Sequence, residues 1–277
     1  MTAPAPYAAE GLTLMAVHAH PDDEVIATGG VLARYSGEGV RTVLVTCTNG
    51  EQGDAAGGAK PGQAGHDPGA VAATRLAELH KSVTYLGVGH LEVLGYRDSG
   101  MVGWAANEDP GVFSNVPLAE VSGRLEELLG KYRPQVVVTY DENGGYGHPD
   151  HIQVHRATVA AAESTGVPAK LYYSAVPRSA VSRFRQELQA AGVEMEALEA
   201  ADDFGVPDEK ITTVVDVTRY VDRIQEALAA HASQVENFFF TRLPPEMVAA
   251  ALSHEYFTLR SAPDGLALED DLFAGLR

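Results

Sequence analysis

Two short segments of the sequence combine imidazole and carboxylate side chains at a spacing that suits a metal ion. They are HPDDE at residues 20–24 and HPDH at residues 148–151. Two histidines and one carboxylate around an open position form a site typical of zinc or ferrous iron, whereas calcium and magnesium prefer oxygen ligands. We therefore expect His20, Asp23 and His151 to bind zinc (Zn²⁺), with Fe²⁺ as the second choice, although residue types alone do not separate Asp22 from Asp23.

Both segments follow predicted β-strands. Four short apolar runs read as strands, at residues 12–18, 42–46, 91–96 and 135–140. Between them, apolar residues three or four positions apart predict helices, most clearly over 72–86 and 118–132. Strand and helix alternate, which predicts an α/β fold: a Rossmann-like, mainly parallel sheet with helices on both faces. Because ligand crevices form at the carboxyl ends of such strands, the polar residues should meet there.

The second half of the chain has a looser pattern. We predict helices near 179–191, 220–231 and 246–252, and an extended run over 211–217. No linker rich in Pro, Gly or Ser divides the chain. We therefore predict a single domain over residues 1–277, with a Rossmann-like core over 1–175 and a C-terminal elaboration over 176–277 that is a candidate substrate cap.

The other acids and bases of the two segments suit separate steps of a hydrolysis. Asp22 would act as general base, and a protonated His148 would stabilise a developing oxyanion and then donate to a leaving amine. Asp150 would orient His148 or a ligating imidazole. The adjacent glycines would let Tyr146 swing over the site. The competing explanation is helix capping, but His and Asp recur at two strand ends, which favours a functional cluster.

The AHPDDE and HPDH segments together resemble the signature of the PIG-L/LmbE-like de-N-acetylases, over about the first 175 residues. The resemblance implies a metal, usually zinc, held by His20, Asp23 and His151. It also implies that Asp22 is the base and that His148 is the electrophilic or acidic partner. It thereby separates the two adjacent aspartates, which the residue types alone do not.

Within this family, the chain resembles the branch that acts in mycothiol chemistry. The similar segments are YRDSGM at 96–101, TYDENGGYGHPDH at 139–151 and, in the tail, HASQ at 231–234. The resemblance implies sugar binding by Arg75 and Asp98, with Glu51 as a third candidate. For Arg75, the competing explanation is a surface ion pair with Glu78, three residues further along a helix.

The sequence therefore predicts a metal-dependent amidohydrolase that removes an N-acetyl or other N-acyl group from a glucosamine-containing substrate. N-acetylglucosaminyl-inositol or a related glycoside is the first choice. Alternatives with the same chemistry are a mycothiol S-conjugate amidase and a natural-product N-acetylglucosamine deacetylase. Alternatives of another class are a non-haem iron oxygenase, which uses the same ligand set, and a carbohydrate-binding module, which would leave Asp22 and His148 without a role.

The charge composition limits the classes of partner that the protein can bind. The chain has 38 acidic and 20 basic residues and a formal charge of -18. Binding to nucleic acid or to an anionic membrane depends on clustered Lys and Arg, so we predict a small amino-sugar partner, no nucleic acid and no membrane. The single cysteine, Cys47, and the lack of a signal-like start predict a cytoplasmic location. A homo-oligomer is compatible with the sequence.

One aromatic run allows two interpretations. Phe238, Phe239 and Phe240 would line a sugar-stacking mouth or, more commonly for consecutive aromatics, pack in a core.

Overall fold

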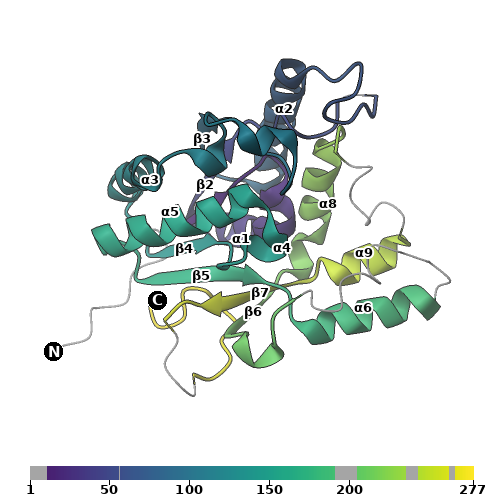
Figure 1. Cartoon of the computed structure of the whole chain (residues 1–277). Coiled ribbons are helices and arrows are strands. Elements are labelled where there is room, and N and C mark those ends of the chain that lie inside the picture. The colour runs from purple at the N-terminus through teal and green to yellow at the C-terminus, as the bar shows by residue number, and fades with distance from the viewer. Residues whose placement is uncertain (1–10, 56, 191–204, 235–242, 262–265) are drawn as a thin grey trace.

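A seven-stranded sheet organises the protein (Figure 1). The computed structural model describes residues 11–55, 57–190, 205–234, 243–261 and 266–277, so Phe238 to Phe240 lie outside the described residues. The strands are β1 (Thr13–His18), β2 (Arg41–Thr48), β3 (His90–Tyr96), β4 (Val136–Thr139), β5 (Lys170–Ala175), β6 (Thr213–Asp216) and β7 (His254–Leu259). Their order is β3-β2-β1-β4-β5-β7-β6. β1 to β5 run parallel, and β7 is antiparallel to both β5 and β6. The predicted mainly parallel α/β sheet is confirmed.

Helices cover both faces of this sheet, as predicted. They are α1 (Asp23–Gly37), α2 (Pro68–Leu86), α3 (Leu118–Tyr132), α4 (Gly144–Gly147), α5 (Pro149–Thr165), α6 (Arg178–Ala190), α8 (Val221–Ala230) and α9 (Pro245–Ala251). α1, α2 and α8 pack into one hydrophobic core, and α3 and α5 pack into the other. α6 and α9 lie past the strand ends, next to the end of β5 and the start of β7 (Figure 1).

The buried strands supply both cores. In β1, Leu14 and Ala16 face the core that contains α1, whereas Met15 and Val17 face the core that contains α3. Successive side chains of a strand point to opposite faces, so a strand covered on both sides must be apolar throughout. This requirement explains the continuous apolar runs of the sequence.

Helix α2 contains the predicted range 72–86 and buries most of its apolar stripe, together with polar side chains. Its N-cap Asp67 accepts from the backbone N–H groups of the next turn, and Gly87 ends it with a φ of 71°. Leu79, Val83 and Leu86 of this stripe are buried, whereas Ala72 and Leu76 are only partly buried. The buried side chains also include three polar ones: Arg75, Glu78 and Ser82. Each of these three side chains forms hydrogen bonds to a segment distant in sequence. The spacing of apolar residues along a helix cannot predict such bonds.

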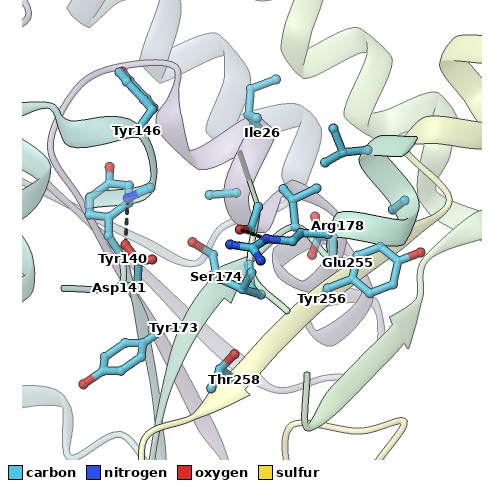
Figure 2. A pocket seen from close by; sticks show the side chains of 18 of the residues that line it. Ile26, Tyr140, Asp141, Tyr146, Tyr173, Ser174, Arg178, Glu255, Tyr256 and Thr258 are labelled. Atoms are coloured by element: carbon cyan, nitrogen blue, oxygen red, sulfur yellow. Dashed lines mark hydrogen bonds between the residues drawn. The ribbon is translucent and has the colours of Figure 1, made fainter. Parts of the chain in front are cut away.

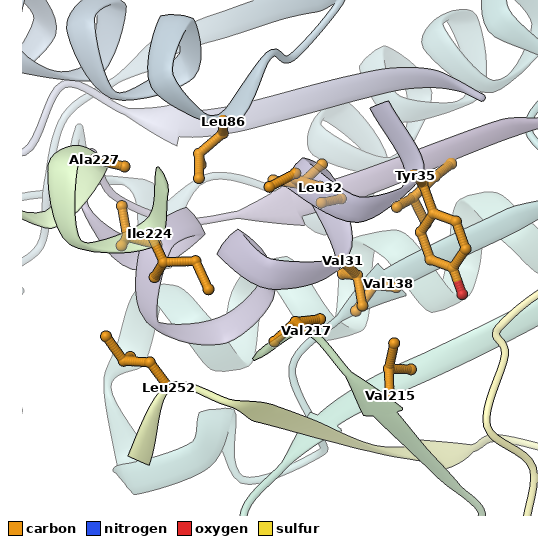
Figure 3. Packing of buried hydrophobic residues seen from close by; sticks show 14 of the residues in the cluster. Val31, Leu32, Tyr35, Leu86, Val138, Val215, Val217, Ile224, Ala227 and Leu252 are labelled. Atoms are coloured by element: carbon orange, nitrogen blue, oxygen red, sulfur yellow. The ribbon is translucent and has the colours of Figure 1, made fainter. Parts of the chain in front are cut away.

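The C-terminal elaboration continues the same sheet. β6 and β7 extend it beyond β5, and α8 packs against α1 and α2. Val215 and Val217 belong to the same hydrophobic core as Val31, Ile224 and Leu252 (Figure 3). The helices predicted near 179–191, 220–231 and 246–252 are present within one residue at each end. β5 and β7 were not predicted, and the division at residue 175 stays a prediction.

Two adjacent glycines lie in α1, and one of them is in close contact with the segment after β6. A Cβ on Gly30 would lie 2.5 Å from Cγ2 of Val217, so only glycine fits there without movement of the neighbouring segment. A Cβ on Gly29 would meet nothing closer than 3.6 Å. Among the described residues, no helix is long and apolar enough to cross a membrane.

Candidate functional site

Three side-chain atoms form a small triangle at the carboxyl ends of β1 and β4. His20 Nδ1 lies 3.2 Å from Asp23 Oδ2 and 3.3 Å from His151 Nε2. His151 Nε2 lies 3.4 Å from Asp23 Oδ2. In a tetrahedral zinc site, bonds of roughly 2.0–2.1 Å place neighbouring ligand atoms about 3.3 Å apart. The triangle therefore fits one face of such a coordination sphere.

Each imidazole in the triangle has its other nitrogen bonded. His151 Nδ1 lies 3.1 Å from the Gly144 carbonyl, to which it must donate, so its Nε2 keeps a free lone pair toward the triangle. His20 Nε2 lies 3.1 Å from Asp150 Oδ2. A ligating histidine is commonly oriented in this way, through the nitrogen that does not bind the ion. The two rings are thus held in the tautomers that ligation requires.

Asp150 is fully buried and bonds to the candidate ligand His20, which is one of the two targets expected for it. The backbone N–H of Ser99 donates to its Oδ2 over 3.0 Å, and the Ser99 hydroxyl donates to Oδ1. Ser99 follows β3, so three strand ends meet around this carboxylate. Its contact with His148 is different, because there the backbone N–H of Asp150 donates to the ring.

His148 is neutral in this arrangement, which differs from the protonated form expected. Its Nδ1 accepts the Asp150 N–H over 3.1 Å and so caps the start of α5. Burial lowers the pKa of His148 to about 3, and the imidazoles of His20 and His151 add to the effect. A ring that accepts at Nδ1 carries its proton on Nε2, so His148 can donate one hydrogen bond from that atom.

Asp22 lies beside the triangle and pairs with Arg75 instead of with a member of the triangle. Its Oδ2 pairs with Nη2 of Arg75 over 3.0 Å. Its φ is 116°, a conformation that residues other than glycine rarely adopt. Its backbone N–H donates to Oε2 of Glu24 over 2.9 Å. Burial raises the pKa of Asp22, although the Arg75 guanidinium opposes the shift. The adjacent aspartates therefore have separate surroundings.

Arg75 is buried and does not form the alternative ion pair with Glu78. Nη1 donates to the Gly50 carbonyl over 2.7 Å, and Nη2 donates to the Pro21 carbonyl over 2.6 Å. A Cβ on Gly50 would lie 2.5 Å from Nη1, so the loop after β2 needs glycine there. Arg75 thus joins the loops after β1 and β2. Glu78 instead accepts two bonds from Ser233.

The two other predicted sugar-binding residues lie in the same crevice. Asp98 Oδ1 accepts the Gly100 N–H over 2.8 Å and lies 3.5 Å from His20 Nε2. Glu51 is 9% exposed, and its Oε2 has no hydrogen-bond partner among the described residues. Burial raises the pKa of Glu51. A buried acceptor without a donor is the kind of group that a ligand hydroxyl can satisfy.

Sequence reasoning missed Tyr140, which ends the fourth apolar run. Its hydroxyl donates to Asp23 Oδ2 over 2.8 Å and accepts the Ala19 N–H over 2.9 Å. Its ring stacks on His151 with centroids 4.1 Å apart. The available signal was its position directly before the polar loop, where a strand-end tyrosine places its hydroxyl at the crevice.

A cavity of about 1060 Å³ opens beside the triangle. Asp23 and His151 line one end, together with Tyr146, which is 57% exposed and whose ring lies 5.0 Å from that of His151. The cavity extends among β5, β7, α6 and α9 toward Arg178 and Glu255 (Figure 2). Its described lining contains none of Arg75, Asp98 and Glu51. The predicted sugar-binding residues and the cavity are therefore separate regions around the triangle.

Two overlapping groups of buried residues have donor atoms close enough for one ion. They are His20, His148 and His151, and His20, Asp98, His148 and Asp150. Both contain His20, and the triangle with Asp23 adjoins them. The residues of this crevice can therefore hold a metal ion.

Comparisons with known proteins agree with this chemistry. The family model described as "PIG-L: GlcNAc-PI de-N-acetylase" matches residues 15–162. A 1D-myo-inositol 2-acetamido-2-deoxy-alpha-D-glucopyranoside deacetylase from Acidothermus cellulolyticus is 44% identical over 95% of each chain. A relative of the same name from Catenulispora acidiphila is 40% identical over 95% of this chain and 89% of its own.

Solved structures share the fold at low sequence identity. An N,N'-diacetylchitobiose deacetylase from Pyrococcus horikoshii has a TM-score of 0.57 at 19% identity, over 89% of this chain and 83% of its own. A 4-carboxy-2-hydroxymuconate hydratase from Pseudomonas putida has a TM-score of 0.55 at 14% identity, over 91% and 97%. Because a hydratase also has this fold, the structural likeness does not choose a reaction. The family model and the 44% identical relative do establish the lineage, and this chain belongs to the PIG-L de-N-acetylase family.

Proposed function

We propose that this protein is a metal-dependent hydrolase that removes the acetyl group from 1D-myo-inositol 2-acetamido-2-deoxy-α-D-glucopyranoside or a closely related glycoside. The observation that carries the proposal is the triangle of His20, Asp23 and His151 with a separate carboxylate, Asp22, beside it. The choice of substrate is supported by relatives that are named for this deacetylation. They are 36–44% identical to this chain and match 94–95% of it.

We propose zinc as the ion, with ferrous iron as the second choice. The donor set of two imidazole nitrogens and one carboxylate oxygen suits both. When bound, such an ion lowers the pKa of water and polarises an amide carbonyl. Asp150 and the Gly144 carbonyl keep His20 and His151 in the tautomers that can ligate it.

Asp22 is proposed as the general base. A carboxylate with a raised pKa accepts a proton more readily than an ordinary aspartate, and burial raises the pKa here. Arg75 fixes the direction of the side chain through the 3.0 Å contact with Oδ2. In this role Arg75 positions the general base, in addition to any contact with the sugar.

His148 is proposed to stabilise the transition state as a neutral donor. Its Nδ1 is occupied by the Asp150 N–H, so the Nε2 proton is the one that can face a developing oxyanion. Tyr146 lies on the exposed side of the same rings and would cover the bound amide. Glu51 and Asp98 would receive sugar hydroxyls, since Glu51 Oε2 lacks an internal donor.

The direct test is acetate release from the inositol glycoside. Protein loaded with zinc should produce the free amine, detected by mass spectrometry, and the chelated protein should not. Asp22→Asn, loaded with the same metal, serves as the inactive control. If zinc-loaded protein leaves this substrate and a panel of N-acylglucosamines intact, the proposed function is wrong.

The cavity favours a second candidate, an amidase for bulkier N-acyl groups such as that of mycothiol S-conjugates. An acetyl group needs far less than the 1060 Å³ that adjoins Asp23 and His151. Comparing kcat/KM for the acetyl substrate and for a thiol conjugate separates the two candidates. Oxygen uptake measured with an electrode tests the oxygenase alternative at the same time.

A cytoplasmic location and a purely small-molecule partner complete the proposal. The only cysteine, Cys47, is buried as a free thiol, which suits a reducing compartment. Fractionation of cells that produce the protein would locate it.

A further inference from the structure

The segment HASQ at residues 231–234, in the C-terminal elaboration, contacts Glu24, the residue that follows Asp23. It follows α8, and His231 Nε2 lies 2.7 Å from Oε1 of Glu24 in α1, 207 residues away in sequence. Both side chains are 0% exposed. The resemblance to the mycothiol branch includes this segment, and the roles proposed so far leave it unused.

Glu24 connects His231 to the proposed base. Its Oε2 accepts the backbone N–H of Asp22 over 2.9 Å, while its Oε1 also accepts the Ser82 hydroxyl over 2.5 Å. The Asp22 backbone has a φ of 116° and a ψ of -27°. A conformation that is rare for an aspartate persists only when its surroundings hold it. Glu24 holds the backbone of Asp22 from one side, and Arg75 holds its side chain from the other.

The Glu24 carboxylate itself depends on His231. A charged group that is completely buried must be paired and hydrogen-bonded. The described partners of Glu24 are the Asp22 N–H, the Ser82 hydroxyl and the His231 ring, and only the ring can carry a positive charge. Removal of that ring would leave the buried carboxylate with two neutral donors and no positive partner, which would weaken its hold on the Asp22 N–H.

We propose that His231 is a positioning residue for catalysis: it fixes Glu24, and through Glu24 it keeps the backbone of Asp22 in the conformation that base catalysis uses. This inference rests on the proposed function, because it takes Asp22 as the base. It assigns the elaboration a direct part in assembling the site, beyond a candidate cap. It also predicts that His231 affects kcat and leaves KM and metal binding nearly unchanged.

The test compares three variants of the same segment. His231→Leu removes the donor, and His231→Gln keeps an N–H at nearly the place of Nε2. Ser233→Ala is the matched control, since it removes a bond whose partner is Glu78 on α2. We expect kcat to fall at least tenfold in His231→Leu, with KM within twofold and metal content unchanged. His231→Gln should recover most of kcat, and Ser233→Ala should lower only the melting temperature.

Three results would overturn the proposal. One is a His231→Leu protein with kcat within twofold of the unmodified chain. The second is an equal loss of kcat in Ser233→Ala, which would mean that the segment acts through stability alone. The third is a His231→Gln protein as impaired as His231→Leu. If His231→Leu does not fold, His231→Asn replaces it, because the asparagine amide is one carbon too short to reach Glu24.

Crystal structures keep this test independent of the substrate. In His231→Leu or His231→Asn, the Asp22 N–H should lose its bond to Glu24, and the φ of Asp22 should leave the region near 116°. An unchanged Asp22 backbone would contradict the inference even if no substrate were known. If the unmodified protein shows this geometry but releases no acetate, the proposed function fails while the structural link stands.

Discussion

At the scale of single residues, the adjacent aspartates of the HPDDE segment show why the sequence alone left a choice. Asp23 begins α1 and points to His20 and His151, whereas the positive φ of Asp22 turns its side chain toward Arg75. No property of the residue type separates them. The candidate ligands could be predicted from type and spacing, but the division of roles depends on one backbone angle.

The two aspartates should respond differently to the same change. Asp22→Asn should reduce kcat by about two decades or more, the usual contribution of a general base, with bound zinc near one per chain. Asp23→Asn should lose the metal, because the triangle then has no carboxylate. Elemental analysis with steady-state kinetics measures both. Loss of zinc from Asp22→Asn would show that it is a ligand.

Arg75 offers a second test at this scale. Its guanidinium reaches two carbonyls and one carboxylate at once, a geometry that the single ammonium group of lysine cannot reproduce. If Arg75 positions Asp22, Arg75→Lys should lower kcat by about tenfold or more and change KM little. A large rise in KM with kcat retained would instead support the sugar contact that the family resemblance implied.

At the scale of elements, the sequence predicted the strands and helices that are buried by continuous or regularly spaced apolar residues. β1, β2 and β4 were recognised because both of their faces are covered, and β3, an edge strand with only Leu94 buried, was recognised from its apolar residues. β5 and β7 were missed because their side chains are partly buried, so neither run is continuously apolar. α2 and the apolar part of its buried face were recognised, but its buried polar residues were not, because Arg75, Glu78 and Ser82 are paired with loops, with α1 and with the tail. Pairing with distant segments leaves no local pattern.

Packing between α1 and the segment after β6 can be tested with paired glycine substitutions. Gly30→Ala should destabilise the protein by about 1–3 kcal/mol, because its Cβ would collide with Val217. Gly123→Ala on α3 is the control, since its Cβ would meet nothing within 4 Å. The control should gain about 0.5–1 kcal/mol from helix propensity. Equal effects on the free energy of unfolding would contradict the close approach.

Glu255 connects β7 to α1 through hydrogen bonds. Its raised pKa leads us to predict that the stability of the fold depends on pH. It accepts the N–H groups of Gly30 and Val31 over 2.6 and 2.8 Å, and burial raises its pKa from 4.5 to about 8. The folded state then binds the proton more tightly than the unfolded state. The stability that Glu255 contributes is therefore complete below its unfolded pKa and is lost as the pH rises through about 8.

The matching experiment uses Glu255→Gln, which mimics the protonated side chain. Its melting temperature relative to the unmodified protein should rise steadily as the pH is raised from about 5 to about 9 at constant ionic strength. A difference that is independent of pH would show that Glu255 titrates alike in the folded and unfolded states.

At the scale of the whole molecule, metal binding and folding should be coupled. The proposed ligands come from the loop after β1, the start of α1 and α5, and His20 and His151 are 131 residues apart, so the triangle exists only in the folded chain. An ion that binds only this state stabilises it by about 4 kcal/mol at a thousandfold excess over Kd. Zinc should therefore raise the melting temperature and a chelator should lower it. In Asp23→Asn the shift should disappear.

The position of β7 has a consequence for how the chain is made. β6 precedes β7 in sequence, yet β7 is the only strand with which it pairs along its length among the described residues. During synthesis on the ribosome, β6 therefore waits without a strand neighbour until residues 254–259 emerge, and the β5 edge remains open for the same period. Unpaired edges invite association with other chains. The nascent protein thus has two open strand edges until β7 emerges, and a chaperone that shields strand edges during that period would raise the yield.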